Sequence, residues 1–268
     1  MVIPPVLKTG TLQEVCGFES HLLRQRPRRS MDRTFGCGPK NCRFESCRGH
    51  YIWSMKANIK ILNKANIASG KIKSLIPEFY ELKNVIENTD DSWHDQESVF
   101  DHTQSVISSL EKLFSKARGN LKKILNQKID KNTRKILLKV SAVFHDIAKK
   151  ETIVKDKQGF TVCPGHAEAG AEKAKRILNR FDLSEREKRF ILDIIGGHIH
   201  FHLLLSLENY GNFQRDFPII KNRYLNSVYP ELILLDYADT VNAGIRKTQP
   251  KEYRYRMDFY KREIEKLS

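Results

Sequence analysis

The sequence lacks the features of a membrane-embedded or secreted protein. No stretch reaches the roughly 18 consecutive apolar residues that a membrane-spanning helix needs. The first ten residues, MVIPPVLKTG, contain two prolines and lack the charged-then-apolar order of a signal peptide. We therefore expect a cytoplasmic protein with no membrane partner.

Cysteine is scarce over most of the chain. Four of the five cysteines fall within the first 50 residues, and Cys163 is the only one that follows them. A single thiol cannot form an internal disulfide, so the fold after residue 50 must be held by its core. Hydrophobic residues make up 40% of the chain, which is enough for a globular core.

Acidic residues are outnumbered. The chain has 47 Lys and Arg against 32 Asp and Glu, a net charge of +15. Such an excess favours polyanionic partners, namely nucleotides, nucleic acid or anionic membrane surfaces. A basic, solvated surface without a partner is the alternative, and charge alone does not choose between them.

Residues 1–54 differ in kind from the remainder, 55–268. They are rich in Arg, Gly, Cys and Pro and show no helical or strand periodicity. The pentapeptide CGFES at 16–20 recurs as CRFES at 42–46. Phe-Glu-Ser is the translation of the TTCGA(A/G)TC core of a tRNA T-arm, so we interpret 1–54 as a mis-called start that runs through tandem tRNA genes. Translation would then begin at Met55, and peptides from 1–50 in the native protein would refute this.

Two other interpretations of residues 1–54 remain open. A zinc module is one, because Cys37, Cys42 and Cys47 are evenly spaced with His50 nearby. Zinc sites favour closer cysteine pairs on tight turns, so the match is loose. A disordered basic arm that binds nucleic acid is the other.

After residue 74 the apolar pattern predicts helices. The segment 132–148 is strongly apolar and predicts a central buried helix. Ser184 followed by Glu187 predicts a capping box at a helix start. The expected helices are 74–87, 98–116, 132–148, 166–181, 184–196, 229–243 and 252–267.

Regular β-structure is predicted only once. Residues 152–163 contain two short β-prone runs around KDKQG, which predicts a hairpin. Strands and helices do not alternate along the chain, so we expect no parallel sheet. The segment 203–223 is expected to supply lid loops over a site.

Histidines and aspartates recur on the predicted helices. The pair His145–Asp146 ends the central apolar helix, in the segment VFHDIAK. Adjacent helical residues point about 100° apart, but near a helix end both can converge on one ion. An isolated pair would more often be a hydrogen-bonded core histidine beside a capping aspartate. This pair has companions, which are Trp93–His94, His102, His166, His198 and Asp239.

The ordered set resembles the HD superfamily of metal-dependent phosphohydrolases. The motifs are WH at 93–94, VFDHT at 99–103, HDIAK at 145–149, GHAEAGA at 165–171 and AD at 238–239. Within that superfamily they are most similar to the HD domain of bacterial CCA-adding tRNA nucleotidyltransferases. The resemblance covers roughly residues 90–243 and implies an all-α HD-domain helical bundle with one short β-hairpin. The chain has Ala148 where family members usually carry Gly.

The resemblance also implies the site residues. His102, His145, Asp146 and Asp239 match the core metal ligands, while His166 and His198 match the ligands of a second ion. Asp146 and Lys149 are the expected catalytic residues, with Lys149 placed to meet a phosphate as a point charge. Asp236 against Asp239, and His200 or His202 against His198, remain open alternatives. The predicted ligands are His102, His145, Asp146, His166, His198 and Asp239.

The predicted function is phosphate ester hydrolysis with one or two divalent ions. Imidazole with carboxylate suits Mn, Fe, Zn, Ni or Co, and carboxylate with water suits Mg. A bound ion acidifies water and neutralises phosphate charge. The expected substrate is a phosphorylated small molecule, such as a nucleotide, or a nucleic-acid end. The alternative is an RNA- or nucleotide-binding HD module without turnover. No Gly-Ser followed by Asp-x-Asp is present, so no nucleotidyltransferase head is expected.

Overall fold

The computed structural model describes residues 56–88 and 93–268, and the features predicted for residues 1–54 lie outside this range. The described chain is a helical bundle with two small antiparallel strand pairs. The predicted all-α fold class is therefore confirmed. None of the described helices is both long enough and apolar enough to cross a bilayer.

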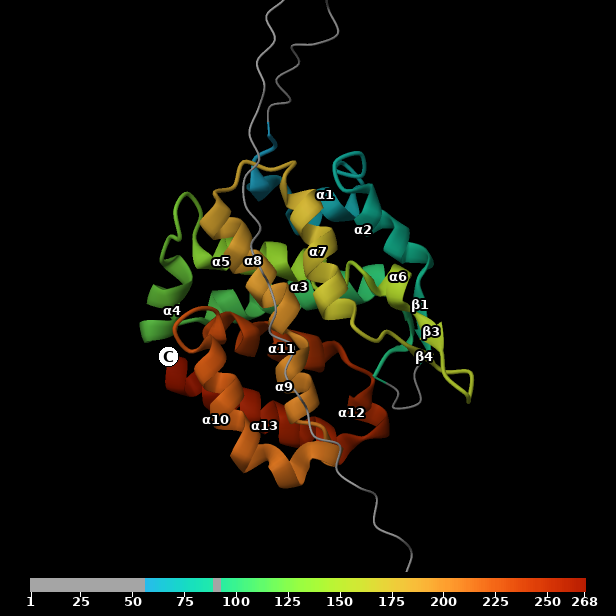
Figure 1. Ribbon diagram of the computed structural model, residues 1–268. Coiled ribbons are helices and arrows are strands. Elements are labelled where there is room, and N and C mark those ends of the chain that lie inside the picture. Colours follow the sequence, from blue (N-terminus) through green and yellow to red (C-terminus); the bar gives the residue numbers. More distant parts are fainter. Residues whose placement is uncertain (1–55, 89–92) are drawn as a thin grey trace, which may run out of the picture. The chain divides into compact units, whose positions relative to one another are not determined.

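Six helices form the body of the bundle (Figure 1). They pack in the order α7, α8, α5, α3, α11 and α13, each against the next. Helices distant in sequence therefore become neighbours, above all α3 and α11. The bounds are α3 Val99–Lys116, α5 Arg134–Phe144, α7 His166–Leu178, α8 Glu185–Gly197, α11 Tyr229–Asn242 and α13 Pro250–Leu267.

Other elements cover this body. Among the described residues they are the helices η1 Ile59–Ile61, α1 Lys64–Ala68, α2 Pro77–Glu81, η2 Leu82–Asn84, α4 Gly119–Asn126, α6 Lys149–Thr152, α9 Ile199–Leu204, η3 Leu207–Asn212, α10 Phe213–Tyr224 and α12 Ile245–Thr248, and the strands β1 Ile86–Asn88, β2 Asp95–Ser98, β3 Val154–Lys155 and β4 Thr161–Val162.

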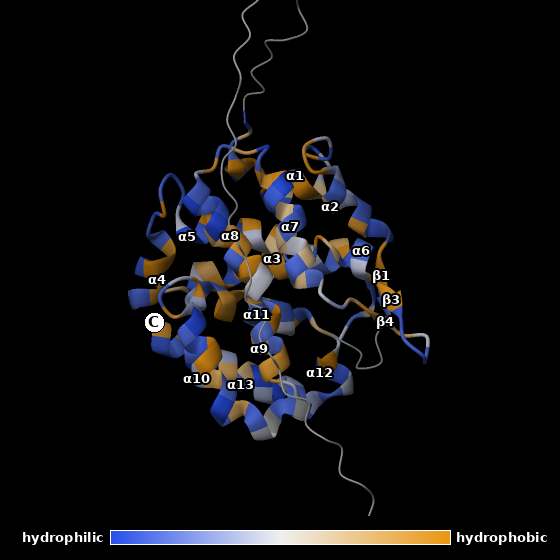
Figure 2. Ribbon diagram, in the orientation of Figure 1, coloured by the Kyte–Doolittle hydropathy of each residue, from blue (hydrophilic) through white to orange (hydrophobic). Residues whose placement is uncertain are grey.

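Apolar side chains fill the space between the helices. Phe144 of α5 and Leu110 of α3 are fully buried, as are Ile194 of α8 and Leu235 of α11. Burial of such side chains stabilises the fold by roughly 1.5–3 kcal/mol each. In Figure 2, α10 and α13 carry both apolar and polar residues along their length, as amphipathic helices at a surface do.

Side-chain caps fix where two site-bearing helices begin. Ser98 caps α3 by accepting a hydrogen bond from the Asp101 backbone N–H. The predicted capping box at Ser184 and Glu187 is confirmed at the start of α8. Glu187 also accepts the backbone N–H groups of Lys131 and Asn132, which ties the loop before α5 to α8. These caps fix the positions of the helices that carry His102 and His198.

The β-structure is partly as predicted. The expected hairpin is confirmed, since β3 pairs with β4 and Val154 faces Val162. The pair β1–β2 was not predicted. It replaces the end of the helix expected over 74–87, of which only α2 and η2 are helical. Val85 is extended and its carbonyl accepts the Val99 backbone N–H, so this chain segment pairs with β2 instead of continuing a helix.

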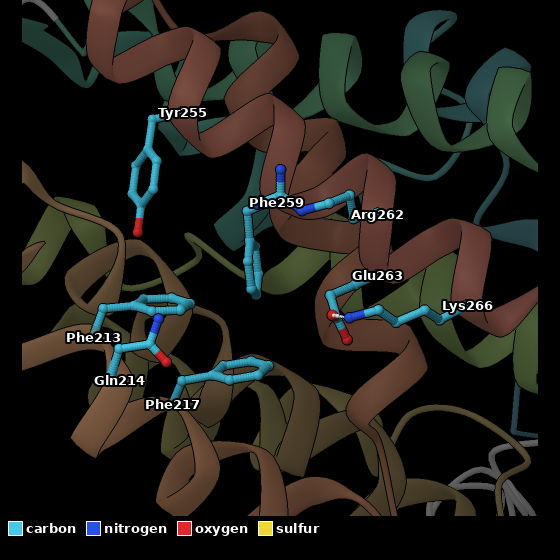
Figure 3. A pocket seen from close by; sticks show the side chains of 8 residues that line it. All are labelled: Phe213, Gln214, Phe217, Tyr255, Phe259, Arg262, Glu263 and Lys266. Carbon is cyan, nitrogen blue, oxygen red and sulfur yellow. Dashed lines mark hydrogen bonds and ion pairs between the residues drawn. The ribbon is translucent and has the colours of Figure 1, made fainter.

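The segment 203–223 is largely helical, which corrects the expectation of lid loops. It contains the end of α9, then η3, then most of α10. Phe213 and Phe217 of α10 stack on each other and meet the edge of Phe259 of α13 (Figure 3). A cavity of about 420 Å³ remains beside these rings. Aromatic packing on α13 therefore gives this segment helical structure that its sequence pattern did not predict.

Candidate metal centre

The segment His145–Ala148 forms a tight turn between α5 and α6. The Ile147 N–H bonds to the Phe144 carbonyl, and the Lys149 N–H bonds to the Asp146 carbonyl. Both bonds span three residues rather than four, so the α-helix ends at Phe144 instead of continuing through residue 148 as predicted. The tighter turn places the side chains of His145 and Asp146 in one buried space.

On one side of Asp146, three side chains meet that come from three parts of the chain, namely His102, His145 and Asp239. His102 Nε2 of α3 lies 2.7 Å from Asp239 Oδ1 of α11, although the two residues are 137 positions apart in sequence. His145 Nε2 lies 3.2 Å from Asp146 Oδ2. The ligand atoms of His102, His145 and Asp146 are mutually within 4.8 Å, which is close enough to hold one metal ion.

The contact between His102 and Asp239 is strongly ionic. Burial lowers the pKa of His102, but the hydrogen bond and charge of Asp239 outweigh this effect and raise that pKa to about 10. Burial raises the pKa of Asp239, yet His102 and His202 together hold it well below its usual range. The two atoms in this contact, His102 Nε2 and Asp239 Oδ1, could both ligate a metal ion.

A second group forms on the other side of Asp146. Asp146 Oδ1 lies 3.5 Å from His166 Nε2 of α7 and 3.8 Å from His198 Nε2 at the end of α8. Ligand atoms of these three residues also lie within 4.8 Å of one another. The two oxygens of Asp146 therefore face different histidine groups.

The hydrogen bonds of the histidines fit a metal site. His145, His166 and His198 each bond through Nδ1 to the backbone carbonyl three residues earlier, at 2.8, 2.8 and 2.6 Å. Only an N–H can donate to a carbonyl, so each neutral ring presents an Nε2 lone pair. The Nε2 atoms of His166 and His198 lie 3.2 Å apart. When both rings are in this neutral form, the two lone pairs cannot bond to each other, whereas a proton or a metal ion between them satisfies both.

Other side chains hold the inner residues in place. Glu97 accepts from His102 Nδ1 at 3.0 Å, as an outer carboxylate does for a metal-bound histidine. Lys149 Nζ lies 3.0 Å from Asp146 Oδ2, 2.8 Å from Glu87 Oε2 and 3.1 Å from His94 Nε2. Three acceptors match the three N–H bonds of an ammonium group. Lys149 is thus fully engaged in fixing Asp146.

A cavity of about 450 Å³ opens onto His166 and His198 of the second group, and onto Asp146 and Asp239, while His102 and His145 do not line it. Its polar floor includes Asp146, His166, His198 and Asp239. The remaining lining comes from β4, the start of α7, α9, α13 and the segment around Trp93. A small molecule in this cavity would therefore touch the histidine and aspartate cluster directly.

Comparison with known families assigns this arrangement. The family model described as the HD domain matches residues 99–244, more than half of the chain. The chain belongs to the HD domain family. The HD superfamily consists of metal-dependent phosphohydrolases, and the paired histidine and aspartate groups are compatible with metal binding. A comparison with curated proteins finds no match. The narrower likeness to CCA-adding enzymes stays a prediction.

The HD site brings together all six residues predicted as ligands. Of the two alternatives His198 and His200, only His198 lies in the cluster. His200 Nδ1 instead bonds to the hydroxyl of Tyr224 at 2.7 Å. Asp236 is fully buried, and burial and the charge of Asp239 raise its pKa well above its usual range. A neutral Asp236 is a poorer ligand than the ionised Asp239.

The sequence patterns did not reveal several supporting residues of the HD site. Glu87 and Glu97 were not singled out, although both contact the cluster. His202 was named only as an alternative to His198, yet its Nε2 lies 3.0 Å from Asp239 Oδ2. Arg256 was not predicted as a site residue, although it lies on the helix predicted over 252–267, and it is buried in the cavity wall.

Proposed function

We propose that this HD protein is a metal-dependent phosphohydrolase that hydrolyses a phosphate ester of a nucleotide or a nucleic-acid end. The observation that carries the proposal is Asp146, whose two oxygens face two separate histidine groups. A protein that only binds phosphates has no need of two adjacent metal positions under a cavity. The paired arrangement is typical of hydrolytic phosphoryl transfer.

The ligand assignment follows the geometry. His102, His145, Asp146 and Asp239 would hold one divalent ion, and Asp146, His166 and His198 would hold the other. Asp239 is preferred to Asp236 because it contacts His102 directly. Imidazole and carboxylate donors suit Mn, Fe, Co, Ni or Zn better than Mg.

The protein groups have defined tasks in the reaction. When bound, divalent ions acidify water and neutralise phosphate charge. Asp146 and Asp239 supply the negative charge that holds cations, and Lys149 keeps Asp146 ionised and oriented. Water adds to phosphorus, the ester P–O bond breaks, and the leaving oxygen departs with a proton from that water. The predicted contact of Lys149 with phosphate would require it to release one of its present acceptors.

The test combines metal content with turnover. Protein starting at Met55, its H145A/D146A variant and its H200A control are loaded with Mn²⁺ and dialysed. Metal is measured by mass spectrometry, and hydrolysis of a generic phosphomonoester and phosphodiester is followed in the same samples. We expect metal and turnover in the wild type and H200A, and neither in the double variant.

The alternative function is an RNA- or nucleotide-binding module that keeps metal for structure. The basic composition is what favours it. Metal binding in the wild type without turnover of either ester would support this alternative. No metal under any loading condition would refute both.

A further inference from the structure

The charges around the HD cavity restrict what the cavity can hold. Two cationic side chains other than histidine line it in the described structure, Lys149 and Arg256. Against them stand three carboxylates of the lining, Glu87, Asp146 and Asp239. The lining thus carries one more negative than positive charge before any metal binds.

Neither cation is free to bind phosphate. Lys149 is 5% exposed, and carboxylates lie within 3.0 Å of it on two sides. Arg256 is 3% exposed and donates to Glu252 Oε1 through Nε at 2.7 Å and to the His202 carbonyl through Nη1 at 2.8 Å. Both charges are therefore already neutralised by protein carboxylates.

Arg256 serves the wall of the cavity. Its guanidinium lies 4.8 Å from the centre of the Trp93 ring, and that ring meets the edge of His202. Cation–π contact and the bond to the His202 carbonyl hold the indole as part of the lining. The guanidinium supports an aromatic surface instead of presenting an open anion site.

The lining also has an apolar part. Beyond Trp93 it includes Val162, Pro164, Ile199 and Leu203. The cavity of about 450 Å³ lies toward the small end of the roughly 300–1,000 Å³ seen for small-molecule sites. Such walls suit the base and sugar of one nucleoside, or another flat group of that size.

We propose that the substrate is a small phosphomonoester with a single phosphate on a nucleoside-sized, mainly apolar group. This inference rests on the proposed function, because the metal positions supply the charge that meets the one phosphate. A second or third phosphate would find no unpaired cation among the lining residues. A nucleic-acid strand adds a phosphate with every nucleotide, so the same argument disfavours it.

The reaction is then simple hydrolysis. Water forms the new O–P bond, and the bond between phosphorus and the ester oxygen breaks. One proton of the water passes to the leaving alcohol, giving inorganic phosphate and the free nucleoside. No oxidant, reductant or further reactant is needed.

The experiment compares ligands that share one nucleoside. Protein starting at Met55, at a fixed free Mn²⁺ concentration, is given AMP, ADP, ATP and a short single-stranded oligonucleotide with a 3′-phosphate. Initial rates give kcat/KM, and calorimetry on the same protein with Ca²⁺ in place of Mn²⁺ gives binding. We expect kcat/KM and affinity for AMP to exceed those for the other three ligands by roughly tenfold or more, which is the size of about one uncompensated charge contact.

Each outcome is decisive. Equal or better use of ADP, ATP or the oligonucleotide overturns the single-phosphate inference and leaves the hydrolase intact. Tighter binding of AMP without turnover of any ligand supports the inference and overturns the proposed hydrolase. Equal binding of all four without turnover overturns both.

A paired substitution tests the charge argument itself. Leu203 lines the cavity and is 54% exposed, so L203K adds a cation there without disturbing the core. Ile219 of α10 is 60% exposed and does not line the cavity, so I219K is the matched control. L203K should raise the ratio of ATP to AMP affinity several-fold, and I219K should not change it. An unchanged ratio in L203K would overturn the inference.

Discussion

Removing one histidine of the second group should remove one metal ion and leave the other. His198 contacts Asp146 Oδ1 and His166 but not the ligand pair His102 and Asp239. An H198A variant therefore keeps every donor of the first position. We expect it to bind one ion where the wild type binds two, and to lose activity about 100-fold, as loss of one preorganised charge contact does.

Loss of one ion should also lower the stability that metal gives to the folded protein. An ion at 100 times its Kd stabilises the folded state by about 2.7 kcal/mol, so two ions give about 5 kcal/mol. For a domain of this size 1 kcal/mol shifts Tm by roughly 2–4 °C. Metal should therefore raise the wild-type Tm by about 10–20 °C and that of H198A by about 5–10 °C.

The assay compares each protein with its own metal-free form. This cancels the cost of the space left by the deleted ring, which is the same with and without metal. H200A is the control, since His200 bonds to Tyr224 outside the cluster. Two ions and a full Tm shift in H198A would refute the bridging arrangement. Loss of an ion in H200A would show that the wrong histidine of the tract was assigned.

Two further predictions concern the frame of the site. E187A should destabilise the fold by about 3 kcal/mol in urea denaturation. The substitution removes a fully buried carboxylate and so leaves the backbone N–H groups of Lys131, Asn132 and Ser184 without their acceptor. E263Q should cost about 1–3 kcal/mol at pH 7, and the difference from wild type should shrink below about pH 4.5. Burial raises the pKa of Glu263, but hydrogen bonds from Lys266, Tyr229 and Lys221 hold it below its usual value. A depressed pKa gives stability above the unfolded pKa that is lost on acidification, so equal pH dependence in E263Q would refute this.

The sequence predicted the long elements of the fold because their patterns are local. Amphipathic spacing marked α3, α7, α8 and α13, and Ser184 with Glu187 marked the start of α8. The strand pair β1–β2 escaped prediction because its register depends on segments that meet only after folding. The helix α10 escaped because Pro218 lies inside it, and a proline within an apolar pattern predicts an interruption of the helix.

In the site, too, some residues were predicted from the sequence and others were found only in the folded structure. The six proposed ligands are histidines and aspartates in motifs that resemble those of the HD superfamily, and this resemblance is what predicted them. Their supports did not stand out, since Glu87 and Glu97 are ordinary in type and act only through position. Lys149 was expected to meet phosphate, and only the three-dimensional contacts show that its charge is already engaged.

The burial of the ligands governs how ions come and go. His102 and His145 have no measurable exposure, and the contact of His102 with Asp239 joins the early and late parts of the domain. Two of the four ligands proposed for an ion there, Asp146 and Asp239, line the cavity. An ion at this position would therefore enter and leave through the cavity, with the two buried histidines closing its inner side. The metal found in purified protein would then reflect the ions to which the folded protein was exposed, as well as the ion that the site prefers.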